Sequence, residues 1–471
     1  MDHERAQESG VLDVTARLAD FVAGLRASDL PREVRDRVGL LAADAIAIAV
    51  RARLDVESTS HLIRAVKAIG LSGGTCSVFG DRESYTPFGA SLINGTLIHS
   101  LDFDDTHAAA ALHPSATVLA AALTAAEMEK ASGEDLIAAV VAGLEVTIRL
   151  SKSLRPADHY DRGFHPTATC GAFGAAAAAS RIMKLSSSQV INAFGIVLSQ
   201  TSGSMQFLDN GGWTKRFQVG NAAAAGLLAA TLARENYLGA SRAIEGANGF
   251  LKSYAPAAVA QDAVADLGVV WETQQIAIKP YPACRFAHAA MDAIIQLRND
   301  HELKLDQVRQ IVCGLSRKAI DLVGHPIEAK RRVSTTAAAQ FSMPFTAIVS
   351  LIEGGMDWDS YGRNLGNDDV GQAMQKVSVE HDLEVEANFP DRFAGRVVIT
   401  TTDGRSLESF VRSPKGEPDN FVTDSELRRK FLGLAEPFLG SQAAELFAEV
   451  KQFESMNVAR AFSLSHPAIE V

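Results

Sequence analysis

Alanine and glycine crowd a series of helix-like segments over the first half of this 471-residue chain, and this series constrains the fold most strongly. Apolar residues recur in these segments at helical spacing. Since small side chains let two helix backbones approach closely, we expect the segments to pack into one large all-helical domain. The segments are Val34–Ala52, Pro87–Ser100, Ser115–Ala131, Gly133–Ser151, Ala168–Lys184, Ser187–Gln200 and Asn221–Leu238.

The pattern changes after about Trp271, where short stretches rich in β-branched residues begin to alternate with helical ones. Strands are predicted at Ile276–Ile278, Gln307–Leu315, Gly395–Thr402 and Ser406–Val411. Helices are predicted at His288–Asn299, Thr335–Glu353, Tyr361–Gln375 and within Thr423–Ala461. We therefore predict a mainly α chain, with a large all-helical domain over residues 1–273 plus 414–471 and a smaller α/β (α+β) lid domain over residues 274–413.

Charge and hydropathy exclude several classes of partner. The net charge of −11 disfavours nucleic acid, because phosphate binding needs a basic face. No apolar run reaches the roughly 18–20 residues that a membrane span requires, so no membrane partner is expected. The four cysteines are far apart and form no CxxC pair, which argues against a structural zinc site and a disulfide framework and favours reduced thiols in the cytoplasm.

An acidic segment, Ser100–His107, is followed closely by His113-Pro114-Ser115. Its three carboxylates fall within four residues and repel one another unless cations, hydrogen bonds or a helix start compensate. A solvated loop with Ser115 or Thr106 capping a helix is one interpretation. A site in which a buried acid orients a histidine is the second, and a metal site is the third, although the spacing matches no standard ligand motif.

Two further segments combine glycine with basic or imidazole side chains. His165 directly precedes a helix whose N-terminal amides favour an anion, although a histidine before a proline is also typical of a cap or turn. The bend from Gly203 through Gly212 ends in Lys215 and Arg216, which could clamp a carboxylate or lie on an ordinary surface loop. No GxGxxG or GxxxxGK[ST] motif is present, so neither nucleotide fingerprint applies.

In the second half, Lys279–His288 (KPYPACRFAH) places Arg285 and His288 three residues apart, on one side if a helix has begun. Cys284 in the same stretch is interpreted as packing, because nothing in the chain demands a lowered thiol pKa. Gln340–Phe345 (QFSMPF) is a helix interrupted by proline, which is either a plain kink or part of a site.

These five segments, in this order, resemble the signatures of the MmgE/PrpD family, which contains 2-methylcitrate dehydratase, cis-aconitate decarboxylase and iminodisuccinate epimerase. The resemblance runs nearly end to end. It implies a helical domain with a smaller lid domain, a homodimer, no required cofactor and no metal. By motif it assigns site positions to Asp102, Thr106, His113, His165, Lys215 and His288. In one departure, Phe345 stands where members often carry tyrosine, so a hydroxyl is missing there.

The reactions of that family make or quench a carbanion beside a carboxylate, which needs a base, an acid and cations. We hypothesise that three histidines supply the base and the acid, that Asp102 orients one of them, and that Lys215 and Arg285 bind a small di- or tricarboxylate. The histidines are His113, His165 and His288, and the further substrate-binding candidates are Thr106, Lys279, Ser204 and Phe345.

The missing hydroxyl at Phe345 weakens both the decarboxylase and the dehydratase assignments and disfavours a decarboxylase slightly more. A dehydratase-type lyase is ranked first, with an epimerase of an iminodisuccinate-like acid or a cis-aconitate-type decarboxylase as alternatives. Two distant alternatives are a metal-dependent hydrolase that uses Asp102, Asp104, Asp105 and His107, and a non-catalytic helical dimer.

Overall fold

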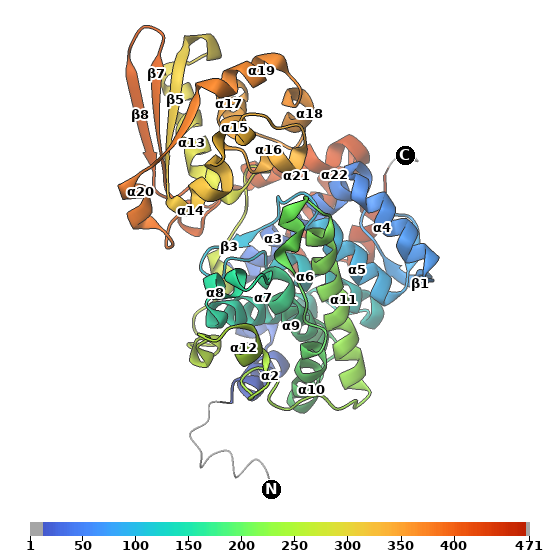
Figure 1. Cartoon of the computed structure of the whole chain (residues 1–471). Helices are drawn as coiled ribbons and strands as arrows, with labels where there is room; N and C mark the ends of the chain where they lie inside the picture. The colour runs from blue at the N-terminus through green and yellow to red at the C-terminus, as the bar shows by residue number, and fades with distance from the viewer. Residues whose placement is uncertain (1–12, 468–471) are drawn as a thin grey trace. The chain divides into compact units, whose positions relative to one another are not determined.

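A computed structural model describes residues 13–467 of the chain. It divides into two compact units (Figure 1): the N-terminal unit comprises residues up to Ile276 and those from Leu434 onward, and the C-terminal unit spans Ala277–Gly433. Within the described residues, no helix combines the length and the hydropathy needed to cross a bilayer.

The N-terminal unit is built around helix α9 (Pro166–Ile182), which contacts α7 (Gly133–Leu154) and α11 (Thr214–Arg234) (Figure 1). Small residues permit this packing. A Cβ atom on Gly174 would lie 2.6 Å from the carbonyl oxygen of Gly143, and one on Gly143 would lie 2.7 Å from the carbonyl oxygen of Gly174. Larger side chains would push these two backbones apart, so the predicted close-packed helical domain is confirmed.

Most other elements of the N-terminal unit are also helices. They are α2 (Val14–Gly24), α3 (Arg32–Asp55), α4 (Glu57–Ala68), α5 (Pro87–Ile98), α6 (Ser115–Glu129), α8 (Pro156–Asp161), α10 (Ser187–Leu198), α12 (Phe250–Tyr254), α22 (Gln442–Lys451) and α23 (Val458–Leu464). The short strands β1 (Ser72–Ser77), β2 (Ser84–Tyr85) and β3 (Thr106–His107) add small extended pieces that the sequence analysis did not anticipate.

The C-terminal unit contains a four-stranded sheet in the order β6-β5-β7-β8. Strand β5 runs parallel to β6 and antiparallel to β7, which runs antiparallel to β8. Along β7 the side chains alternate between buried and half-buried, which is the pattern of a sheet covered on one face. Helices α13 and α17 cover that face (Figure 1). The bounds are β5 Val308–Leu315, β6 Val377–His381, β7 Gly395–Thr401, β8 Ser406–Val411, α13 His288–His301 and α17 Met343–Glu353.

The α/β prediction is confirmed, with three local differences. The helix expected over Tyr361–Gln375 is two short helices, α18 (Ser360–Asn364) and α19 (Asp368–Ala373), because the Asn367 side chain caps the start of the second. Strand β6 was missed because it is short and only its first residue, Val377, is fully buried. The helix expected over Thr335–Glu353 is two helices, α16 (Thr336–Gln340) and α17, because the Ser342 hydroxyl accepts a hydrogen bond from the amide of Phe345 and starts a new helix. Shorter helices complete the unit: α14 Arg317–Ala319, α15 Ile327–Lys330, α18 Ser360–Asn364, α19 Asp368–Ala373 and α20 Leu383–Asn388.

The sequence predicts the second junction between the units at residues 413 and 414. In the structure this junction lies later, between Gly433 and Leu434, within helix α21 (Asp424–Leu439). The segment before α21 is tied to the C-terminal unit by backbone hydrogen bonds. The amide of Lys415 donates to Asp292 Oδ2 (2.7 Å), and the amide of Ile278 donates to the carbonyl of Gly416 (3.1 Å). The first junction lies within strand β4 (Ile276–Ala277).

Candidate active site

The acidic segment forms a tight turn directly after α5 in the N-terminal unit. Helix α5 ends at Ile98, His99 follows as its C-cap residue, and Asp102 adopts a left-handed backbone conformation with φ of 52°. Aspartate tolerates this region better than most residues. The turn lets the three neighbouring carboxylates face three different surroundings, which relieves the repulsion between them.

Asp104 is the buried centre of the turn, with 1% of its surface exposed. Its Oδ2 lies 2.7 Å from Nδ1 of His99, and its Oδ1 lies 3.3 Å from Nδ1 of His113. Burial alone would raise the pKa of Asp104, but the two imidazoles outweigh it and hold that pKa well below its usual range. One ionised carboxylate therefore bridges two histidines.

His99 is a neutral imidazole in this arrangement. Burial lowers its pKa to about 4, although Asp104 opposes that shift. Because an ionised carboxylate only accepts hydrogen bonds, Nδ1 of His99 carries the proton that is donated to Asp104. Its Nε2 therefore presents a lone pair, and this atom is buried without a hydrogen-bond partner.

The opposite edge of His113 faces a second carboxylate and a lysine. Its Nε2 lies 3.8 Å from Asp102 Oδ1, and Nζ of Lys215 donates to that same oxygen at 2.9 Å. Lys215 comes from the first turn of α11. The side chains of His113, Asp102 and Lys215 are 14%, 13% and 23% exposed, so solvent reaches this face of the cluster.

His165 completes the cluster from the N-terminus of α9. Its ring centroid lies 5.8 Å from that of His99, and its backbone amide donates to the carbonyl of Gly203 at 3.0 Å. Burial, and then the neighbouring His99 and Lys215, lower the pKa of His165 well below its usual value. The amide nitrogen of Gln218 donates to Nδ1 (2.7 Å), so the ring proton is on Nε2, which can serve as a hydrogen-bond donor.

Asp105 differs from its neighbours because burial raises its pKa well above the usual value. It accepts hydrogen bonds from both the amide (3.3 Å) and the hydroxyl of Ser115, the first residue of α6. We interpret Asp105 as a structural group that holds the start of this helix. The three carboxylates are thus separated into one that pairs with a cation, one that binds two imidazoles and one that caps a helix.

One group of side chains in the described residues has the geometry of a metal site. His99, Asp104 and His113 each offer one ligand atom, and these atoms lie within 4.8 Å of one another. The short bond between His99 and Asp104 already uses two of these atoms. His107 does not join the group, because its Nε2 lies 3.1 Å from Oε2 of Glu272. The set proposed for a metal-dependent hydrolase, which relied on His107, is therefore not brought together.

Two other residues that were predicted for the site, Thr106 and Ser204, also belong to this unit. Thr106 is 8% exposed in strand β3. Ser204 is exposed, and its hydroxyl accepts a hydrogen bond from the amide of Gln206 (3.1 Å), where it caps a short 3₁₀ turn. Its neighbour Gly203 supplies the carbonyl that holds His165, so this loop supports the cluster through its backbone.

Lys279, Arg285 and His288 lie in the C-terminal unit. Arg285 pairs with Glu417 and lies over the ring of Phe393, with 4.9 Å from its guanidinium carbon to the ring centroid. Burial lowers the pKa of Arg285 to about 9. Nε2 of His288 donates to the carbonyl of Ala283 at 3.1 Å. Burial, followed by the charges of Lys279 and Arg285, lowers the pKa of His288 well below its usual value.

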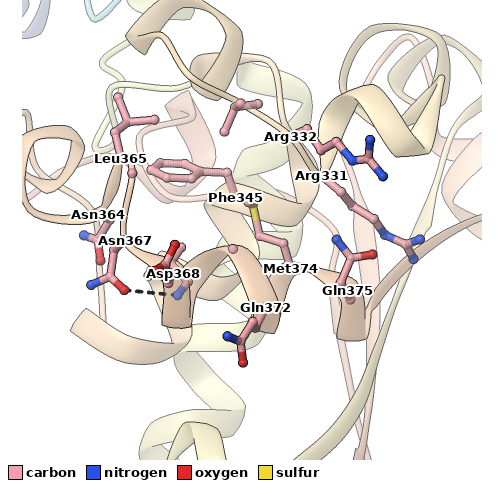
Figure 2. Close-up of a pocket in the computed structure, with 14 residues that line it drawn as sticks. Arg331, Arg332, Phe345, Asn364, Leu365, Asn367, Asp368, Gln372, Met374 and Gln375 are labelled. Carbon is pink, nitrogen blue, oxygen red and sulfur yellow. Dashed lines mark hydrogen bonds between the residues drawn. The ribbon is translucent and has the colours of Figure 1, made fainter.

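Phe345 lies in a different part of the C-terminal unit. It lines a cavity of about 440 Å³, together with Arg331, Leu365 and Met374 (Figure 2). Its ring stacks parallel to that of Tyr361, with centroids 5.8 Å apart. None of the other predicted residues of this unit lines the cavity, so it does not bring Phe345 together with them.

The sequence analysis missed three side chains that shape the cluster: His99, Gln218 and, in its bridging role, Asp104. A signal existed for Gln218, because it lies three residues after Lys215 and therefore on the same face of α11. His99 had a weaker signal, since it lies next to the acidic turn but in a run that otherwise appears as ordinary helix.

Comparison with known proteins shows that both units are similar to domains of one family. The model of the MmgE/PrpD N-terminal domain matches residues 16–262, and that of the MmgE/PrpD C-terminal domain matches residues 281–454. The cis-aconitate decarboxylase-like protein oryM of Aspergillus oryzae is 30% identical, over 91% of this chain and 92% of its own. The cis-aconitate decarboxylases of Aspergillus terreus (30% identical; 97% and 95% covered) and Homo sapiens (26%; 94% and 92%) are similar over comparable lengths.

Proposed function

This chain belongs to the MmgE/PrpD family, and from that premise we propose that it is a cofactor-independent lyase that decarboxylates a small unsaturated polycarboxylic acid of the cis-aconitate type. The observation that carries the proposal is the cluster of His113, His165, Lys215 and Asp102, four residues from three separate segments of the chain. The names of the relatives support decarboxylation over the dehydration that the sequence placed first. Phe345 is therefore a weaker guide to the reaction than its missing hydroxyl suggested.

The chemistry of such an acid explains what the site has to supply. One carboxylate of the substrate is attached to a methylene carbon beside a carbon–carbon double bond. When the bond to that carboxylate breaks, carbon dioxide leaves, and the electron pair forms a new double bond at the methylene carbon. The pair of the former double bond then takes a proton at the far alkene carbon. Each turnover releases one carbon dioxide and consumes one proton, which solvent returns to the donor.

We assign the proton donor to His113. It is the histidine of the cluster that contacts two carboxylates, and its Nε2 edge faces the part that solvent reaches. Asp104 behind its Nδ1 fixes the ring and stabilises a charge on it, which is the role that the sequence analysis gave to Asp102. Asp102 instead accepts from Lys215.

Lys215 and Nε2–H of His165 are the proposed donors to the remaining substrate carboxylates. A lysine beside a neutral imidazole donor gives two hydrogen bonds to an anion without placing a second mobile proton next to the reacting carbon. Thr106, Ser204, Lys279, Arg285, His288 and Phe345 keep the substrate-binding or catalytic roles predicted from the sequence as predictions, as do the homodimer and the cytoplasmic location.

The test is to incubate the protein in heavy water with cis-aconitate, citrate, 2-methylcitrate and iminodisuccinate and to record proton NMR spectra and carbon dioxide release. We expect cis-aconitate to give one carbon dioxide per molecule consumed, two new terminal alkene protons and one deuterium at the former alkene carbon. The variant His113→Asn serves as the inactive control. Water loss without carbon dioxide would instead identify a dehydratase, and exchange without net loss an epimerase.

A further inference from the structure

We propose that His99 is a positioning residue of this site, which acts through Asp104 by competing with His113 for a single buried carboxylate. In this way His99 sets how tightly His113 holds the proton that it delivers. The inference rests on the role of His113 proposed above. It adds to that role a residue that does not touch the substrate.

The competition is visible in the unequal sharing of the carboxylate. His99 makes the shorter contact to Asp104, a 2.7 Å hydrogen bond. His113 makes the longer one, at 3.3 Å, and neither its Nδ1 nor Asp104 Oδ1 satisfies hydrogen-bond geometry. His99 and Asp104 are 0% and 1% exposed, so no water weakens the bond between them. The stronger hydrogen bond of the carboxylate is thus given to the histidine that does not reach the solvent-accessible face.

Several neighbouring groups contribute charge around this pair, including Asp105, whose carboxyl interacts with that of Asp104. The rings of His99 and His113 are 4.8 Å apart, and that of His165 lies 5.8 Å from His99. Lys215 lowers the pKa of both His99 and His165, so it also acts on this group from α11. The groups that face His113 from the surrounding elements are His99, Asp102, Asp104, His165 and Lys215, while Tyr160 and Arg216 interact with Asp102.

A carboxylate that accepts a short bond from a neutral imidazole offers less negative charge to a second imidazole. If the hydrogen bond from His99 is removed, His113 is the remaining imidazole that can donate a hydrogen bond to Asp104. Asp104 then interacts more strongly with a positive charge on His113, so His113 gives up its proton less readily. Catalysis should therefore extend to more alkaline pH, while the rate on the acidic plateau falls.

The first experiment compares pH profiles of kcat/KM for cis-aconitate. His99→Leu removes the donor while keeping a similar volume, and we expect its alkaline limb to move up by about half a pH unit or more, with a plateau kcat lowered by about threefold to tenfold. His99→Asn keeps a donor near the position of Nδ1 and should restore most of the wild-type profile. His159→Leu is the matched control, because this histidine is also buried but bonds to Tyr254 and Thr169 instead of a carboxylate. An unchanged limb in His99→Leu overturns the proposal.

The second experiment uses the wild-type protein, so it remains decisive if His99→Leu does not fold. Nitrogen-15 NMR of histidine-labelled protein should show His99 as a neutral ring protonated at Nδ1 from about pH 5.5 to 9. Its resonance is assigned from the spectrum of His99→Asn. A ring that titrates in that range, or that carries its proton on Nε2, overturns the inference. Full turnover in His113→Asn would refute the proposed function itself, whereas an inactive His113→Asn with an unshifted His99→Leu profile refutes only the role of His99.

Discussion

The sequence predicts the same role for His113 and His288, that of a catalytic acid or base, yet the two histidines lie in opposite electrostatic surroundings. In the N-terminal unit, His113 contacts the carboxylates of Asp102 and Asp104. In the C-terminal unit, the neighbouring charges are Lys279, Arg285 and Lys430, which together with burial lower the pKa of His288. Nearby carboxylates stabilise the protonated form of an imidazole, and nearby cations destabilise it.

This difference suggests that the two histidines have different roles. The flanking carboxylates suit His113 to carry a proton, whereas the cations around His288 keep that ring neutral, with its one N–H donated to the carbonyl of Ala283. The two ion pairs differ in exposure mainly at the cation. Lys215 is 23% exposed and Asp102 13%, while Arg285 and Glu417 are each 10% exposed.

The largest expected effect separates the two histidines directly. His113→Asn should lower kcat by about 10²- to 10⁴-fold, because it removes the proton donor. His288→Asn should lower kcat by about tenfold or less, because the single N–H of its neutral ring is already donated to the carbonyl of Ala283. Steady-state kinetics of both variants, with circular dichroism to confirm folding, makes the comparison. If kcat falls more in His288→Asn than in His113→Asn, the proposed difference between their roles is wrong.

The two ion pairs are expected to support different properties. Arg285 and Glu417 should contribute mainly to stability, and Lys215 and Asp102 mainly to activity. Arg285→Met leaves the carboxylate of Glu417 buried without its partner, and we expect a loss of about 3–5 kcal/mol in the free energy of unfolding. Lys215→Met should cost about 1 kcal/mol or less, since Lys215 reaches solvent and Asp102 still faces His113, but it should lower kcat/KM by about 10²-fold.

Urea unfolding and kinetics of these two variants test both halves of that prediction. The double variant Arg285→Met/Glu417→Gln is the control, because it removes the stranded charge and should recover most of the lost stability. An Arg285→Met protein as stable as the wild type would show that this pair is not what holds Glu417 in place.

His159 tests whether burial without a cluster of cations is enough to keep a histidine neutral. Burial lowers its pKa to about 4 from the usual 6.5. Between these values the unfolded chain binds a proton that the folded chain does not, so the contribution of His159 to stability is present above pH 6.5 and is lost as the pH falls toward 4. The stability difference between wild type and His159→Gln should therefore shrink by about 2–3 kcal/mol from pH 7.5 to 4.5. A difference that stays constant in urea unfolding at the two pH values would contradict this.

The helical unit and the α/β unit could be predicted because their signals are local. Helical spacing and small residues specify the packing of α7, α9 and α11, and β-branched alternation specifies β5, β7 and β8. The second junction could not be predicted, since it depends on contacts such as that between Lys415 and Asp292, which are distant in the sequence.

The site was predictable only where a motif marked it. Motifs pointed to Asp102, His113, His165 and Lys215, which the fold gathers in one cluster. The partner of each group was not predictable. Whether Asp102 or Asp104 contacts Nδ1 of His113 depends on the left-handed turn at Asp102, and no pattern in the sequence specifies that turn.

The smallest expected effect concerns metal ions, for which the two units again differ. In the described residues, only His99, Asp104 and His113 of the N-terminal unit form a group with ligand geometry. A cation there would have to displace the hydrogen bond between His99 and Asp104 and would take the carboxylate away from His113. We therefore expect exhaustive chelation followed by gel filtration to change kcat by less than about twofold, in line with the metal-independent reaction proposed. Activity that is lost on chelation and restored by a transition-metal ion, with bound metal detected by mass spectrometry, would replace the bridging carboxylate with a metal centre and would remove the basis for the competition between His99 and His113.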